Sequence, residues 1–297
     1  MHLKRVRLYS QKASSQHDVI KKRARERVIP ILKTLIFFIS FMVLIQFLSD
    51  FLSKISGSYG DVLLLAYFLG FPSTYTYLFM RIWNGVTFEE IGFRNPEKAL
   101  NRFLFGIFLG FCIISSFFAF FYCFGYVKLL GFVKPPKISI ILQEILISLI
   151  LVYNEELIFR GYMLNTARKS GLWYSLLITS LTFGIAHLSN PNINILAILG
   201  LTVAGFLLAA SFLIYDEIWV PIGLHFMWNL AEEKIFGFPL SGLDPKSWLF
   251  SVKLTGPEWI TGGNFGPEGG LIPILIELLA ILVIIKFWLR RSSPQPV

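Results

Sequence analysis

The sequence predicts an all-α integral membrane protein, a polytopic helical bundle of about eight transmembrane helices. Of its 297 residues 55% are hydrophobic and only 15% are charged, and the mean hydropathy is +0.66. Soluble domains carry about 25% charged residues, and no soluble core could bury 30 Phe, 11 Tyr and 7 Trp beside so few charges. The apolar residues also gather in stretches about as long as a bilayer is thick. These observations exclude a soluble domain, a disordered chain and a secreted disulfide scaffold.

Eight apolar stretches predict the transmembrane helices, with Gly, Pro and charged residues between them. They cover residues 34–52, 61–82, 102–124, 138–168, 171–188, 193–214, 217–232 and 272–289. The fourth stretch is too long, and too polar at its end, to lie wholly in lipid. No internal repeat divides the chain, so residues 34–290 are expected to form a single integral membrane domain. Residues 233–271 are rich in Gly, Pro and Trp, which predicts a loop rather than a further helix, either a packed cap or an interfacial segment.

Basic residues predict the orientation of the chain. Residues 1–33 carry ten of the 27 Lys and Arg, which indicates a cytoplasmic segment in contact with anionic lipid rather than with nucleic acid. With both termini in the cytoplasm, 20 basic residues lie inside and seven lie outside. Membrane proteins show this bias, so we expect an even number of spans and two cytoplasmic termini.

Ionisable side chains inside apolar stretches are costly in a bilayer and mark functional sites. The segment YNEELIFRGYM holds Glu155, Glu156 and Arg160. Glu156 and Arg160, four residues apart, share a helix face and can pair, whereas Glu155 points about 140° away from Arg160. Glu155 is therefore the candidate reactive carboxylate, with Glu156 and Arg160 as its support. The alternative is an ordinary buried salt bridge beside a spare interfacial glutamate. Two other glutamates, Glu144 and Glu277, are expected to be interfacial.

Two later stretches each contain a histidine. FGIAH puts Phe183 and His187 on one helix face, and HFMWN does the same for His225 and Asn229. An imidazole and a carboxamide one turn apart suit the stabilisation of a polarised carbonyl oxygen. Each histidine alone is equally well explained as a core residue that bonds a neighbouring helix. A glutamate, a histidine and a His–Asn pair on three helices together predict one reaction centre.

These three motifs resemble the CPBP family of intramembrane proteases, which includes type II CAAX prenyl endopeptidases and bacteriocin-processing homologues. The family pattern is EExxxR, then FxxxH, then HxxxN or HxxxD, and it matches here over roughly residues 138–232. The segment TGGNFGPEGG also resembles bacterial members, which implies a bacterial cell membrane.

The resemblance implies hydrolysis of a peptide bond inside the membrane. The implied substrate is a membrane-associated protein or peptide, with CAAX-type proteins as one class. Glu155 would activate a water with the help of His187, and His225 with Asn229 would stabilise the oxyanion. Glu156 and Arg160 would support the helix.

Three alternatives remain open. Glu155, His187 and His225 could instead bind a catalytic zinc. We favour a metal-free site without cofactors, because Asn229 is paired with His225 and neither histidine has an evident carboxylate partner. A transporter or ion pathway also collects such residues, although no inverted repeat is present. An immunity or scaffold protein could keep the fold without hydrolysis, but all three motifs are intact.

Overall fold

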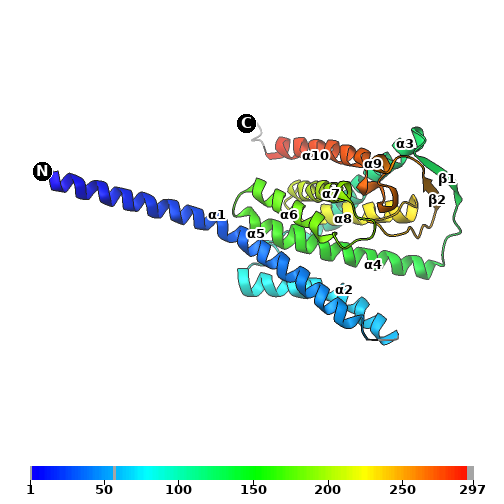
Figure 1. Cartoon of the computed structure of the whole chain (residues 1–297), viewed down its shortest axis with the longest axis horizontal. Coiled ribbons are helices and arrows are strands. Elements are labelled where there is room, and N and C mark those ends of the chain that lie inside the picture. The colour runs from blue at the N-terminus through cyan, green and yellow to red at the C-terminus, as the bar shows by residue number, and fades with distance from the viewer. Residues whose placement is uncertain (1, 56–57, 293–297) are drawn as a thin grey trace.

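Helices occur in all eight apolar stretches of the computed structural model, which describes residues 2–55 and 58–292 (Figure 1). They are α1 (His2–Leu52), α2 with the π-helical η1 (Ser58–Leu78, Phe79–Asn84), α3 (Ala99–Cys123), α4 with the π-helical η3 and α5 (Ile138–Glu156, Leu157–Leu164, Asn165–Arg168), α6 (Leu172–Ala186), α7 (Ile195–Leu213), α8 with the π-helical η4 (Trp219–Asn229, Leu230–Ile235) and α10 (Leu271–Ser292). The 3₁₀ turn η2 (Pro96–Lys98) precedes α3.

Five helical segments of the described chain are long and apolar enough to cross a membrane. They are Arg25–Leu52, Pro96–Cys123, Ile138–Arg168, Ile195–Leu213 and Leu271–Arg290, while Leu172–Ala186 is apolar but shorter. These segments support an integral membrane helical bundle, and the number of eight spans stays a prediction. The side chains of residues 1–24 lie outside the described part, so the lipid contact expected of the basic segment 1–33 also stays a prediction.

Two helix pairs cross at glycines, which lets their backbones touch. A Cβ atom added to Gly106 of α3 would lie 2.2 Å from the carbonyl oxygen of Val220 in α8, and one added to Gly223 would lie 2.1 Å from that of Phe103. In the α6–α7 pair, a Cβ on Gly184 would lie 2.5 Å from Oγ1 of Thr202. Small residues are the usual means of close helix packing in membranes. The two crossings fix α8, which carries His225, and α6, which ends directly before His187.

Two short strands depart from the all-α prediction. β1 (Val127–Phe132) and β2 (Phe250–Leu254) pair in antiparallel fashion, with Val127 opposite Leu254 and an irregularity between Leu129 and Gly131. Both lie beyond the helix ends, at the right of Figure 1, where their backbone groups have no helical partners and bond each other instead.

Residues 233–271 are more ordered than a loop. Besides β2 they contain α9 (Glu258–Thr261) and the 3₁₀ turns η5 (Gly263–Phe265) and η6 (Pro267–Gly269), and their buried side chains include Phe238 and Phe265. The glycines leave no space for side chains, since a Cβ on Gly262 would lie 1.7 Å from the carbonyl oxygen of Gly266. The Gly-rich composition thus reflects close packing, which sequence reading cannot tell from an irregular loop.

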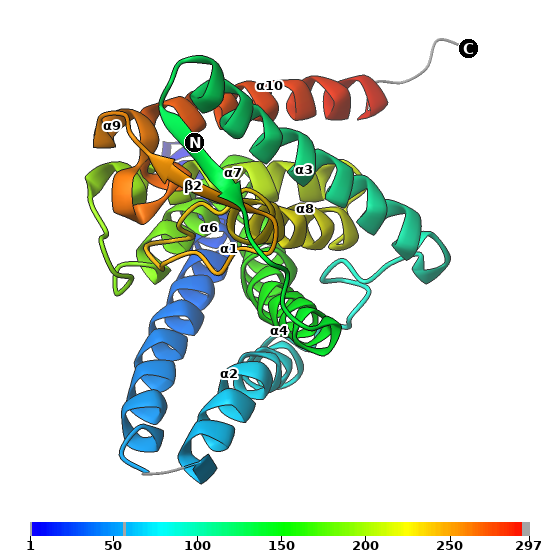
Figure 2. The same cartoon turned by 90° about the vertical axis from the view of Figure 1, so that its right-hand side faces the viewer.

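The bundle has two chemically different ends. We call the first the basic end: here Arg94 and Arg168 both bind Asp216, and Arg102 binds Glu217. These contacts join the segment after η1, the start of α3 and the end of α5 to the turn after α7. We call the opposite end, with β1, β2 and the turn 187–194, the strand end. Figure 2 views the molecule from the strand end, with β1 and β2 in front.

Candidate active site

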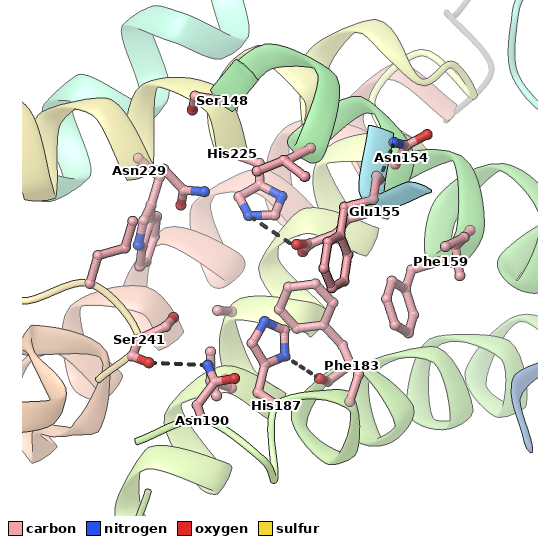
Figure 3. A pocket seen from close by; sticks show the side chains of 18 of the residues that line it. Ser148, Asn154, Glu155, Phe159, Phe183, His187, Asn190, His225, Asn229 and Ser241 are labelled. Carbon is pink, nitrogen blue, oxygen red and sulfur yellow. Dashed lines mark hydrogen bonds and ion pairs between the residues drawn. The ribbon is translucent and has the colours of Figure 1, made fainter. Parts of the chain in front are cut away.

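A cavity of about 620 Å³ lies between α1, α2, α4, α6, α7 and α8, and the segment after η4 covers part of it. Glu155, His187, His225 and Asn229, the four side chains predicted to be catalytic, all line this cavity. Figure 3 shows them around one space, with Asn229 beside His225. The structure therefore brings together residues that are up to 74 positions apart in the sequence.

The two glutamates at the end of α4 have different surroundings. Glu156 is fully buried, and one of its oxygens accepts a hydrogen bond of 2.9 Å from Arg160, so the ion pair predicted from the spacing is present. Arg160 also donates to the carbonyl oxygen of Gly205 at 3.0 Å and lies 4.5 Å from the ring centre of Phe183. The side chain of Glu155 is 38% exposed and faces the cavity.

His225 has a carboxylate partner, contrary to the prediction. Its Nδ1 donates to the same oxygen of Glu156 that binds Arg160, at 2.8 Å. The partner comes from another helix, and helical spacing reveals neighbours on one helix only. Its Nε2 faces Glu155, with 3.9 Å to the nearer carboxylate oxygen. That distance is too long for a direct hydrogen bond.

His187 is held by the backbone of its own helix. Its Nδ1 lies 2.8 Å from the carbonyl oxygen of Phe183. A carbonyl oxygen only accepts, so Nδ1 carries the hydrogen and Nε2 of the neutral ring is left as an acceptor. The Phe183 ring lies between the two histidines, 4.9 Å from the ring centre of His187 and 6.0 Å from that of His225. Phe183 thereby sets the separation of the two imidazoles.

Sequence reading missed several polar residues in the cavity wall. Glu268 on η6 accepts hydrogen bonds from Trp228 Nε1 at 3.1 Å and from the Ser241 hydroxyl at 2.5 Å. The backbone oxygen of Ser241 accepts a further bond from Asn190, at 3.1 Å. All three of Glu268, Ser241 and Asn190 line the cavity. The sequence feature that could have revealed Glu268 is the segment GPEGG, in which glycines on both sides of one carboxylate indicate a tightly packed turn.

Glu277 was expected to be interfacial, but its side chain is fully buried. It belongs to α10, which packs against α7 and η6, and its apolar sequence context does not reveal that packing. Glu232 in η4 is buried as completely. Among the described residues, the carboxylate of Glu277 has no hydrogen-bond partner.

Glu144 was also expected to be interfacial, and its partly exposed side chain lies at the rim of the cavity. There it accepts a hydrogen bond from Trp248 Nε1 at 2.7 Å and lies 3.3 Å from the ammonium group of Lys234.

The residues proposed as an alternative zinc set do not form a ligand cluster. No group of three or more His, Cys, Asp or Glu side chains in the described ranges is arranged to hold a metal ion. The metal-free prediction rested partly on the lack of a carboxylate partner for either histidine, and His225 has such a partner in Glu156. Metal-bound histidines also donate their second ring nitrogen to a carboxylate, so this contact does not argue against a metal. Nε2 of His225 and the nearer oxygen of Glu155 are 3.9 Å apart, and the choice between a metal-free site and a zinc site stays a prediction.

Comparison with known proteins agrees with the motifs. Residues 137–231 match the family model described as type II CAAX prenyl endopeptidase Rce1-like, and this range contains all three motifs and ends two residues after Asn229. Comparisons with curated proteins and with solved structures gave no significant match. Residues 137–231, about a third of the chain, are thus similar to the Rce1-like type II CAAX prenyl endopeptidases, and this match supports the predicted resemblance to the CPBP intramembrane proteases.

Proposed function

We propose that the chain is an intramembrane endopeptidase that hydrolyses a peptide bond in a membrane-associated protein or peptide without a metal ion. The observation that carries the proposal is the convergence of Glu155, His187, His225 and Asn229 on one cavity. The cavity is large enough to admit a short peptide segment together with water. The match to a protease family over the same residues supports the same reaction.

In the proposed mechanism, Glu155 accepts a proton from a water molecule, whose oxygen then attacks the peptide carbonyl carbon. Nε2 of His187 is free to accept a hydrogen bond from that water and so to orient it. The oxyanion that develops receives hydrogen bonds from the Asn229 amide and from Nε2 of His225. For His225 to donate there, its ring must carry both protons, and the Glu156 carboxylate on Nδ1 balances that charge. Glu155 then returns its proton to the leaving amine.

The experiment that tests this function compares the membrane peptides of cells that produce the wild-type chain with those of cells that produce Glu155→Gln. Uncut substrates should accumulate only in the variant. Glu144→Gln is the matched control, because it makes the same change on the same helix at the cavity rim. If the peptide profiles of wild type and Glu155→Gln do not differ, the chain is not a protease that depends on Glu155.

Replacing Asn229 tests the oxyanion role. We expect Asn229→Ala to lower kcat by about 10²–10³ with little change in KM, the size seen when one oxyanion donor is lost. Asn229→Asp should be at least as damaging if the amide donates to the oxyanion, because an ionised carboxylate would repel the charge. Steady-state kinetics on a peptide substrate measure both variants. Wild-type rates in both would mean that Asn229 only packs helices.

Metal removal tests the metal-free mechanism. We expect prolonged dialysis against a strong chelator to leave cleavage unchanged, and elemental analysis to find well below one zinc per chain. A stoichiometric metal that restores activity to chelated protein would instead make Glu155, His187 and His225 ligands.

A further inference from the structure

Glu268 joins two parts of the cavity wall that carry candidate catalytic residues. It lies in η6 and is only 5% exposed. One of its carboxylate oxygens accepts a hydrogen bond of 3.1 Å from Nε1 of Trp228, and the other accepts one of 2.5 Å from the Ser241 hydroxyl. The two donors belong to different elements, α8 and the segment before β2. A single buried carboxylate therefore connects these two elements.

The bond to Trp228 restrains the end of α8. Trp228 directly precedes Asn229 and follows His225 by three residues. The α-helical hydrogen bonds stop at Asn229, where the π-helical η4 begins. Side chains of one helix turn together, so an indole that is held from outside the helix also holds the direction of its neighbours. The bond from Glu268 therefore restrains the direction in which Asn229 points.

The bond to Ser241 leads to the turn that follows His187. The backbone oxygen of Ser241 accepts the bond from the Asn190 side chain that Figure 3 shows, and the backbone N–H of Asn190 donates to the carbonyl oxygen of His187 at 2.9 Å. Ser241 has a φ of +48°. This conformation is unfavourable for residues other than glycine and persists where the surroundings determine it. Glu268 and Asn190 supply that restraint at the hydroxyl and at the carbonyl oxygen.

Glu268 can act as a fixed point because its own turn has no room to move. A Cβ atom added to Gly200 of α7 would lie 1.8 Å from the backbone oxygen of Glu268, and one added to Gly266 would lie 2.0 Å from that of Pro239. The turn η6 thus touches the backbone of α7 on one side and the segment after η4 on the other. Backbones in such contact cannot shift without moving their neighbours.

We propose that Glu268 is a positioning residue for the reaction centre. This role rests on the proposed function, in which Asn229 donates to the oxyanion and His187 orients the attacking water. Through Trp228 the carboxylate of Glu268 directs Asn229, and through Ser241 it holds the turn after His187. It thereby keeps the oxyanion donor and the water-orienting histidine at a constant separation.

Substitutions of Glu268 test this role by kinetics. Glu268→Ala removes both acceptors, and we expect kcat to fall by about 10²-fold with little change in KM, the effect that a displacement of about 1 Å has on catalysis. Glu268→Gln should restore most of the activity, because its amide oxygen accepts from Trp228 and its NH₂ group donates to the Ser241 hydroxyl. Wild-type kinetics in Glu268→Ala, or an equal loss in Glu268→Gln, would overturn the proposal.

Glu144→Ala is the matched control. It also removes a carboxylate of the cavity wall that accepts a hydrogen bond from an indole, that of Trp248 at 2.7 Å. Trp248 lies before β2 and away from Asn229 in the sequence, so kcat should stay close to the wild-type value.

A double substitution tests the connection to Asn229. Trp228→Phe breaks the bond to Glu268 and keeps an aromatic ring. It should lower kcat in the wild-type background and have little further effect in Asn229→Ala, because the donor that it positions is already absent. Equal losses in the two backgrounds would show that Trp228 only packs the helix, which contradicts the positioning of Asn229.

Backbone hydrogen exchange of the purified protein tests the proposal without catalysis. Glu268→Ala should speed exchange in the segments 187–192 and 225–229 and leave α4 unchanged, whereas Glu144→Ala should change neither segment. If Glu268→Ala does not fold, Trp228→Phe and Ser241→Ala break the two bonds one at a time. Unchanged exchange in both segments would refute the proposal whether or not the chain is a protease. Wild-type cleavage by Glu155→Gln would instead refute the proposed function and leave the exchange result standing.

Discussion

Glu155→Gln is expected to lower the rate of peptide cleavage by about 10²–10⁴-fold, the contribution typical of a general base, because an amide cannot accept the proton of the attacking water. The side chain is 38% exposed and, in the described structure, makes no hydrogen bond through the oxygen nearest His225, so its replacement should leave the fold intact. Cleavage of a membrane-peptide substrate by purified protein, measured beside the thermal melting temperature, separates the two effects.

Glu144→Gln is the control for this experiment, and we expect it to retain most of the activity. It carries the same chemical change on the same helix, but its carboxylate binds Trp248 and Lys234 at the rim. A Glu155→Gln variant with wild-type activity would remove Glu155 from the mechanism.

Glu156→Gln is expected to cost about 3–5 kcal/mol of stability, the range for breaking a buried ion pair from one side. Its carboxylate accepts hydrogen bonds from both Arg160 and His225, and the side chain is fully buried, so the positive charge that remains would be left in a setting of low dielectric. The melting temperature in detergent should fall, and the activity of the protein that remains folded should fall too because His225 loses its orientation.

The matched control for stability is Glu277→Gln. Glu277 is as fully buried as Glu156, but among the described residues its carboxylate has no hydrogen-bond partner. The same substitution should therefore change the melting temperature much less there. Equal losses in the two variants would mean that burial of the amide, and not loss of the ion pair, determines the effect at Glu156.

Local patterns predicted local structure well. The apolar stretches marked the helices, and the four-residue spacing of Glu156 and Arg160 predicted an ion pair that is present. Both conclusions need only the geometry of one helix. The three motifs also predicted the resemblance to the family whose model matches residues 137–231.

Contacts between distant elements could not be predicted in this way. Glu156 and His225 are 69 residues apart and meet because α4 packs on α8. The burial of Glu277 depends on η6, and the bonds of Glu268 depend on Trp228 and Ser241. A single sequence records which residues are polar, but tertiary packing decides which of them meet.

The π-helical turns η3 and η4 begin directly after Glu156 and Asn229. A turn closed by i→i+5 hydrogen bonds contains one residue more than an α-turn, and one residue corresponds to about 100° of helix rotation. Each helix therefore changes the face it presents to its neighbours just beyond Glu156 or Asn229. In evolutionary terms, a one-residue difference in length can be absorbed in the part of η3 beyond Arg160 and in η4, while the EExxxR and HxxxN motifs keep their register. Relatives compared with this chain should be aligned with that freedom allowed after each motif, and nowhere within it.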